Sequence, residues 1–323
     1  MLFFALLAPA VPGCVPVPER EDDSGTDAVV DGRIDVPDPE GTSVRLVGAE
    51  VILEPHQDVM YCEVGTWEWG DAAVSRFAWF QNPEYAHHFM FMETDFTPDE
   101  HADGEVVDCT HPKVIPMEHM QPLVMGTRVL ADAWGAMELP PGVAVSVPAD
   151  TRYILQEHWI NATDRRVLVQ DLANITFVDP ATVTDWATPF IHDNSTFSLP
   201  PGQASSATID CEWEADYTLV ALMGHMHEWG RSYSIDWIHG DITERVYEVD
   251  NWTPDLRDAP RVDAFEPGAF VVSEGDRFLT TCNWVNDTDE ALQFPTEMCD
   301  SVGLVYPSAA SIKCEPAKDQ TPR

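Results

Sequence analysis

Short stretches of alternating apolar and polar residues, separated by turns rich in proline and glycine, run through most of this chain. The segment 43–55, SVRLVGAEVILEP, has the two-residue alternation of a half-buried β-strand. The chain contains 26 prolines, and long helical runs of Ala, Leu, Glu and Lys are absent. We therefore predict an all-β protein of two antiparallel β-sandwich, jelly-roll-like domains packed side by side.

The sequence divides into two halves of similar character. Leu-Pro-Pro-Gly occurs at 139–142 and again at 199–202, each time just before a strand-like run. We expect an N-terminal domain over 43–182, a C-terminal domain over 183–316 and a short tail over 317–323.

The first residues, MLFFALLAPAVPGC, contain an apolar run that is too short to span a bilayer. This run is typical of an export signal, although no Lys or Arg precedes it. VPGC resembles a bacterial lipobox, in which Cys14 becomes lipidated, so residues 1–14 would form the signal. The acidic, proline-rich segment 15–42 is predicted to be a tether. We expect an exported protein of the bacterial cell envelope, lipid-anchored or secreted.

Six further cysteines remain, an even number that predicts three disulfides in an exported chain. They are Cys62, Cys109, Cys211, Cys282, Cys299 and Cys314. Fifteen pairings are possible, and the absence of a Cys-x-x-Cys pair argues against a zinc knuckle. Five Asn-x-Thr sequences are interpreted as chance matches and turn residues rather than glycosylation sites, because a lipobox indicates a bacterial protein.

The formal charge is −39, which excludes nucleic acid as a plausible partner because a phosphate backbone would be repelled. The charge also disfavours an anionic membrane surface, so we expect membrane contact only through the lipid anchor. An acidic coat of this kind keeps an exported protein soluble, and a salty habitat would screen its self-repulsion. We expect a monomer.

Histidines occur in three patterns that are compatible with metal binding. His225 and His227 would lie on the same face of a strand, where their two imidazoles could bind one metal ion as a bidentate pair. His87 and His88 are adjacent, so both reach one ion only if the backbone bends. A third, His158, lies alone in an apolar strand. Chance surface or core histidines are the alternative for each pattern.

Met298 adds a soft thioether ligand beside Cys299, and thioethers select Cu(I) over zinc or magnesium. Taken together, the motifs resemble those of the type II copper, ascorbate-dependent monooxygenases, which include peptidylglycine α-hydroxylating monooxygenase and dopamine β-monooxygenase. The resemblance covers residues 45–315 and rests on His-His at 87–88, Leu-Gln-x-His at 155–158, HMHEWGR at 225–231 and Glu-Met-Cys at 297–299.

The resemblance implies two copper ions per chain. His87, His88 and His158 would bind one in the first domain, and His225, His227 and Met298 would bind the catalytic one in the second. Gln156 matches a family residue just behind the first set of ligands. The implied disulfides are Cys62–Cys109, Cys211–Cys314 and Cys282–Cys299.

The family reaction implies hydroxylation of a C–H bond in a small organic substrate by O₂, with ascorbate or a similar donor as co-substrate. The alternative is a non-catalytic copper-binding lipoprotein for storage, delivery or resistance. Met223 and Asp300 replace family residues that hold a substrate carboxylate, so Asp300 favours a cationic or neutral substrate.

Other histidines receive weaker interpretations. The cluster of His111, Met117, His119 and Met120 is either an accessory copper loop or a loosely packed connection. The remaining histidines are expected to be solvent-facing or capping: His56, His101, His192 and His239.

Overall fold

The computed structural model describes residues 28–39, 41–110, 114–116, 119–127, 134–307 and 312–315. Nearly all elements among them are β-strands, and the one α-helix of this part, α1 (Pro254–Asp258), is five residues long. The prediction of an all-β, sandwich-like fold is therefore confirmed. Residues 1–14 with Cys14, and the tail 317–323, lie outside the described residues.

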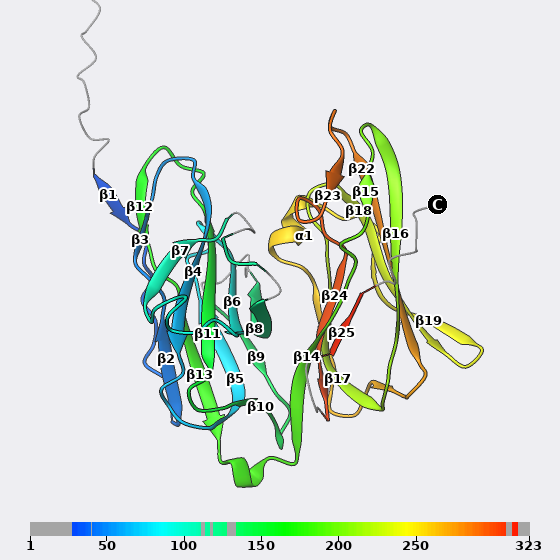
Figure 1. Cartoon of the computed structure of the whole chain (residues 1–323), viewed down its shortest axis with the longest axis horizontal. Helices are drawn as coiled ribbons and strands as arrows, with labels where there is room; N and C mark the ends of the chain where they lie inside the picture. The colour runs from blue at the N-terminus through cyan, green and yellow to red at the C-terminus, as the bar shows by residue number, and fades with distance from the viewer. Residues whose placement is uncertain are drawn as a thin grey trace, which may run out of the picture.

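The first half of the chain forms a sandwich of facing sheets (Figure 1). One layer has the order β7–β4–β11–β6–β8. Its strands are β4 (Asp58–Thr66), β6 (Ala86–Thr94), β7 (Glu105–Asp108), β8 (Met120–Thr127) and β11 (Arg152–Ile160). The opposite layer contains β2 (Ser43–Val47), β5 (Ala72–Phe80), β9 (Trp134–Glu138), β10 (Val143–Val147) and β13 (Leu172–Val178). A small sheet of β1 (Val29–Asp31), β3 (Val51–Leu53) and β12 (Arg166–Val169) continues this layer. Aromatic side chains such as Phe77 and Phe89 fill the space between the layers.

The second half repeats the arrangement. Its inner layer contains β14 (Asp185–Asp193), β17 (Tyr217–His225), β20 (Val262–Ala264), β21 (Val271–Val272), β24 (Asp300–Tyr306) and β25 (Ile312–Cys314). Its outer layer contains β16 (Gln203–Glu212), β18 (Gly230–His239), β19 (Ile242–Val249) and β22 (Arg277–Asn286), with a short pair of β15 (Ser198–Leu199) and β23 (Leu292–Gln293) beside it. Phe190 and Phe278 belong to the core between these layers.

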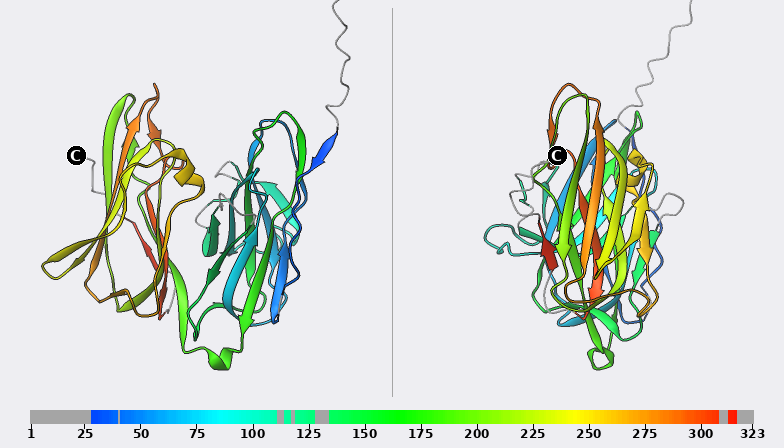
Figure 2. Two further views of the ribbon diagram at one scale, coloured as in Figure 1. Left: turned by 180° about the vertical axis from the view of Figure 1, so that it is seen from behind. Right: turned by 90° about the vertical axis from the view of Figure 1, so that its right-hand side faces the viewer.

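The two sandwiches lie side by side and are joined at one end (Figures 1 and 2). The chain crosses between them through a 3-10 turn, Pro180–Thr182, and β14 then pairs in parallel with β10. Leu304 of β24 and Val220 of β17 share an apolar cluster with Val143 of β10. In β24 the neighbouring Val305 packs into the second core instead. Alternate residues of β24 therefore face the first sandwich.

Two expectations need correction. β1 lies inside the segment 15–42 assigned to a tether, and its parallel pairing with β12 orders the chain before residue 43. His192 was expected at the surface, but it is 2% exposed and packs against Phe190 and Trp213. Alternation in β14 explains this position, since the strand sends every second side chain into the core.

Three of the Asn-x-Thr sequences form buried turns. The side-chain oxygens of Asn161, Asn194 and Asn286 each accept the backbone N–H and the hydroxyl of the threonine two residues on. These asparagines are at most 4% exposed. Their interpretation as turn residues is confirmed, because the side-chain bonds close the local loop.

Candidate metal centres

The first histidine cluster depends on an irregularity in β6. His158 of β11 lies opposite His88, but the next residue of β11, Trp159, lies opposite Ala86. His87 is therefore the extra residue of a β-bulge. Adjacent residues of a regular strand point to opposite faces, and a bulge re-aims one of them. The bend that an adjacent histidine pair requires is thus built into the strand.

The bulge brings three imidazoles together. The ring centroid of His158 is 4.1 Å from that of His87 and 5.1 Å from that of His88. One ring nitrogen from each histidine lies within 4.8 Å of the other two. Three imidazole nitrogens at this spacing suit a copper or zinc ion.

Hydrogen bonds behind the rings determine which nitrogens face the cluster. Nε2 of His88 donates to Oε1 of Gln156 (3.0 Å), and Nε2 of His158 donates to the Asp58 carboxylate (2.6 Å). Each Nδ1 then keeps a lone pair for a cation. The Nδ1 atoms of His87 and His88 are 2.9 Å apart, a distance at which two lone pairs repel unless a proton or a cation compensates them.

Electrostatics favour the neutral, metal-binding form of His88. Burial lowers its pKa well below the ordinary value, and the neighbouring His158 and His87 lower it further. The pKa of Asp58 is also lowered, chiefly by the hydrogen bond from His158. Asp58 was not predicted from the sequence, because its contact with His158 depends on the register of β4 and β11.

The second cluster lies where β17 ends. The ring centroids of His225 and His227 are 5.0 Å apart, as two residues on one face would place them. Nδ1 of His227 donates to the carbonyl oxygen of Thr296 (3.0 Å), so a cation at this ring would bind through Nε2.

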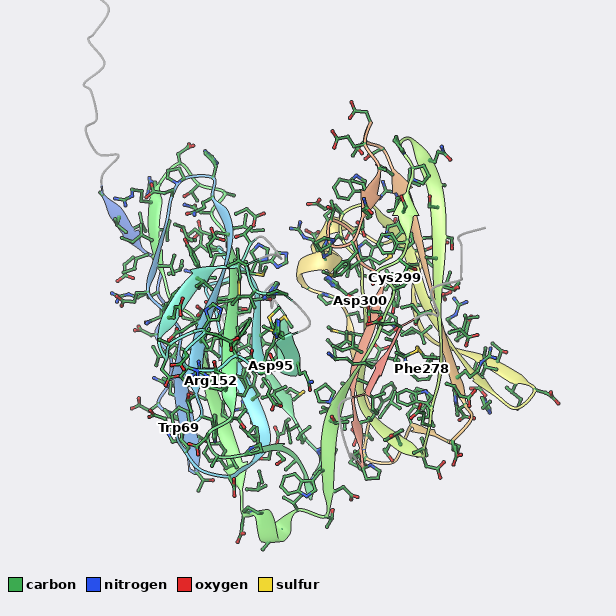
Figure 3. All side chains as sticks on the ribbon, viewed as in Figure 1. Trp69, Asp95, Arg152, Phe278, Cys299 and Asp300 are labelled. Carbon is green, nitrogen blue, oxygen red and sulfur yellow. A yellow bond between two sulfur atoms is a disulfide. The ribbon has the colours of Figure 1, made fainter. Side chains whose placement is uncertain are left out.

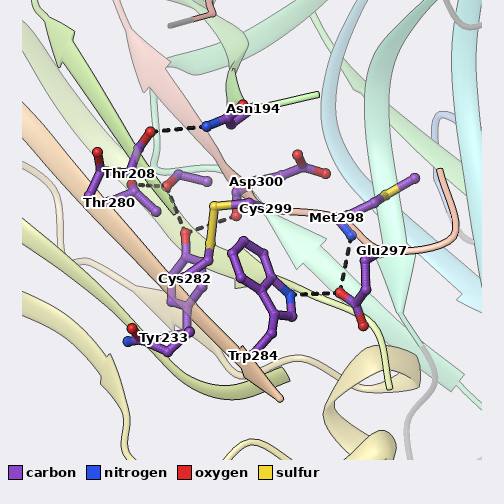
Figure 4. The surroundings of a disulfide bond; sticks show 12 residues. Asn194, Thr208, Tyr233, Thr280, Cys282, Trp284, Glu297, Met298, Cys299 and Asp300 are labelled. Carbon is purple, nitrogen blue, oxygen red and sulfur yellow. Dashed lines mark hydrogen bonds between the residues drawn. A yellow bond between two sulfur atoms is a disulfide. The ribbon is translucent and has the colours of Figure 1, made fainter. Parts of the chain in front are cut away.

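Met298 lies just outside the ladder that pairs β17 with β24. His225 lies opposite Asp300 in the β17–β24 pair, and Met298 precedes Asp300 by two residues. Cys299 between them points into the core, where it is bonded to Cys282. Figure 4 shows the side chains of Met298 and Asp300 extending away from this disulfide. If the register continued beyond the strands, His227 would lie opposite Met298.

Glu297 anchors the backbone of this second cluster, and in the sequence it was visible only as part of the Glu-Met-Cys motif. Its carboxylate is fully buried and accepts four N–H groups. The donors are the backbone nitrogens of His227 (3.0 Å), Trp229 (2.8 Å) and Met298 (3.2 Å), and the indole of Trp284 (2.9 Å). Burial raises the pKa of Glu297, and these hydrogen bonds oppose the rise. The sequence signal was an acidic residue two positions before a cysteine, in Glu-Met-Cys.

The two clusters face each other across the sandwiches. Figure 3 places Asp300 on the side of the second sandwich that faces the first, with Cys299 further inside. The charge of His225 adds a small contribution to the lowered pKa of His88, after burial and the two nearer histidines. Similarly, Arg257 contributes least to the lowered pKa of Asp58.

The structure contains three disulfides, Cys62–Cys109, Cys211–Cys314 and Cys282–Cys299, which are the pairs that the family resemblance implies. They indicate an exported protein, because cytosolic thiols are kept reduced. The helix among the described residues is too short and too polar to cross a membrane.

The cluster around His119 does not form a metal site within the described residues. Nδ1 of His119 bonds Asp95 (2.7 Å), and Met120 is buried in an apolar cluster with Ile115. These contacts favour the packing interpretation. His111 and Met117 lie outside the described residues.

Comparisons with known proteins add little. No family model and no curated protein matches the chain. A peptide-N(4)-(N-acetyl-β-D-glucosaminyl) asparagine amidase is 12% identical over 83% of this chain and 98% of its own, with a TM-score of 0.36. A Paenibacillus xanthan lyase is 8% identical over 83% of this chain and 25% of its own, with a TM-score of 0.22. The VP2 subviral particle of infectious bursal disease virus is 11% identical over 84% and 74%, with a TM-score of 0.20. Nothing about the function of this chain follows from likenesses so weak.

Proposed function

We propose that this protein is an exported copper monooxygenase that hydroxylates a C–H bond of a small organic substrate, using O₂ and a one-electron donor such as ascorbate. One observation carries the proposal: two ligand clusters of different chemistry face each other. His87, His88 and His158 supply imidazoles alone. His225 and His227 lie close together, and the register of β17 and β24, continued by two residues, would add the thioether of Met298 to them.

The donor sets fit two copper ions. Imidazole serves both oxidation states of copper, which suits an ion that stores and passes on one electron. A thioether favours Cu(I), the state that reacts with O₂. Copper at these positions would supply the redox chemistry, in which two electrons and two protons convert O₂ and a C–H bond to a C–OH group and water.

The protein's own residues orient the ligands and shape the site. The hydrogen bonds of Gln156 and Asp58 hold the protons of the first cluster on the outward nitrogens. In the second cluster Thr296 and Glu297 hold the ring and the backbone of His227. No protein side chain acts as a nucleophile in this reaction. The face beside His225 carries Asp300, so a cationic or neutral substrate is favoured over an acid.

We also propose that Cys14 carries the lipid that anchors the protein to the cell envelope and that the protein is a monomer. Lipidation would add a hydrophobic anchor to a chain whose charge is −39. In a bacterial host, Cys14→Ser is expected to release the protein from the membrane fraction while leaving its copper content unchanged. An unchanged membrane fraction would contradict the anchor.

The function is tested by copper titration of the purified protein and by ascorbate-dependent O₂ consumption over a panel of amines, neutral compounds and acids. We expect two copper ions per chain and O₂ uptake that is matched by hydroxylated product. Met298→Ala should abolish turnover, while Met137→Ala on β9, away from both clusters, should retain it. Two bound ions without product from any of the panel would instead favour the non-catalytic copper lipoprotein.

A further inference from the structure

Both sandwiches contain the same buried turn. Trp-x-Asn-x-Thr occurs at 159–163 and at 284–288, and in each the asparagine oxygen accepts the N–H and the hydroxyl of the threonine. In each, the tryptophan indole also donates to a buried carboxylate that follows later in the chain. The acceptor is Asp171 in the first sandwich (3.2 Å) and Glu297 in the second (2.9 Å), and they are 1% and 0% exposed.

The two carboxylates differ in what else they hold. Asp171 accepts the side-chain amide of Gln81 (2.7 Å), which belongs to no metal cluster. Glu297 instead accepts three backbone N–H groups, and two of them belong to proposed metal ligands, His227 and Met298. The same oxygen, Oε2, takes both of these (Figure 4 shows the bond to Met298). The backbones of both ligands are therefore fixed to one atom.

Strand pairing does not hold these two ligands. β17 ends at His225 and β24 begins at Asp300, so His227 and Met298 both lie outside the ladder. A buried carboxylate that accepts several N–H groups is a rigid anchor, because leaving any of those groups unpaired in the core costs free energy. Glu297 therefore fixes the backbones of His227 and Met298, which no strand pairing holds.

We propose that Glu297 is the positioning residue of the second metal centre, holding Nε2 of His227 and the sulfur of Met298 in reach of one ion. The inference rests on the proposed function for the identity of that ion. Glu297 does not bind the ion; it acts through the backbone of the residues that do.

The test compares Glu297→Gln with Asp171→Asn, the same chemical change at the equivalent position of the first sandwich. Glu297→Gln keeps the shape but replaces one acceptor oxygen by a donor amide. In the metal-free protein, we expect the amide hydrogens of His227 and Met298 to exchange faster in Glu297→Gln than in either wild type or Asp171→Asn. With copper, the second ion should bind on the order of 10–100-fold more weakly in Glu297→Gln. The copper–sulfur signal in X-ray absorption should fall with it, while the first ion is retained.

A further variant separates positioning from folding. Glu297→Asp restores both acceptor oxygens on a shorter side chain, so it should recover part of the copper–sulfur signal. Wild-type exchange rates and a full copper–sulfur signal in Glu297→Gln would overturn the inference. Equal loss of the second ion in Asp171→Asn would also overturn it, because the effect would then be general destabilisation.

Copper stoichiometry and product formation of the wild type test the proposed enzyme function separately from the role of Glu297. A wild type that binds two ions but makes no product contradicts the monooxygenase and leaves the role of Glu297 standing. A wild type that binds no second ion contradicts both.

Discussion

The two proposed metal centres hold similar ligands by different means. In the first, all three histidines lie within the paired strands β6 and β11, and a bulge at His87 aims the third ring. In the second, only His225 is part of a strand, while His227 and Met298 depend on Glu297 and on the adjacent Cys282–Cys299 disulfide. The difference teaches that a backbone ladder can place ligands by register, whereas ligands beyond the ladder need separate anchors.

The largest expected contrast comes from removing the disulfide near each centre. Cys62–Cys109 spans 47 residues and Cys282–Cys299 spans 17. Replacing each pair by serine should lower the free energy of unfolding by about 4 and about 3 kcal/mol respectively, because the shorter loop restricts the unfolded chain less. Copper binding should show the reverse order: loss of Cys282–Cys299 should cost less stability but more bound copper than loss of Cys62–Cys109.

Denaturant unfolding and copper stoichiometry measure the two effects. The Cys62–Cys109 variant should keep both ions under conditions where it is folded, since its ligands lie on strands. The Cys282–Cys299 variant should keep only the first ion. Retention of both ions by the second variant would mean that the disulfide does not hold Met298 in place.

A smaller effect is expected from Gln156, which accepts the Nε2 proton of His88. Gln156→Ala should weaken the first copper ion by roughly 10–100-fold, because the ring loses the partner that orients it. Gln170→Ala, which removes a glutamine bonded only to the Gly48 carbonyl among the described contacts, is the matched control. Equal copper affinity in both variants would show that the bulge alone orients His88.

Much of this arrangement follows from local sequence, and the remainder depends on pairing between distant segments. Alternation and turn residues predict the all-β fold, and the two-residue spacing of His225 and His227 predicts a shared face. The bulge at His87 was only stated as a requirement, because it exists in the register between β6 and β11. The burial of His192 was missed for a related reason, since a single histidine does not reveal which face of β14 it occupies.

Two buried titratable groups, one in each sandwich, should contribute opposite pH dependences to the free energy of unfolding. Burial lowers the pKa of His192 to about 3, from 6.5. The unfolded chain takes up this proton as pH falls below 6.5, so stability is lost between pH 6.5 and about 3. Burial raises the pKa of Asp171 from 3.8 to about 7, against the hydrogen bonds from Gln81 and Trp159. Its unfolded carboxyl loses the proton first, so stability is lost as pH rises from about 4 to about 7.

Each slope should approach about 1.4 kcal/mol per pH unit at most. His192→Leu should flatten the loss of stability on the acid side of the profile relative to wild type, and Asp171→Asn should flatten the loss of stability between about pH 4 and about pH 7. Unfolding by denaturant at several pH values measures both differences. A His192→Leu profile parallel to the wild type would mean that the histidine is charged or solvated in the folded protein.

The smallest expected effect concerns the charge beside the second centre. Asp193 and Asp300 lie directly opposite each other across β14 and β24. Burial raises the pKa of Asp300 well above its ordinary value, and the negative Asp193 raises it further. The raised pKa favours the neutral form of Asp300, and a nearby ammonium group would stabilise its ionised form. A substrate carboxylate would gain no such interaction and would be repelled by any negative charge on this pair. Asp300→Asn should therefore lower the preference for amines over acids by several-fold, about 1 kcal/mol for one partly screened charge. Asp241→Asn, in the exposed turn between β18 and β19, should leave that ratio unchanged. A wild type that prefers acids would show that a positively charged group elsewhere offsets the negative charge of Asp193 and Asp300. The two centres would then differ only in how their backbones are held.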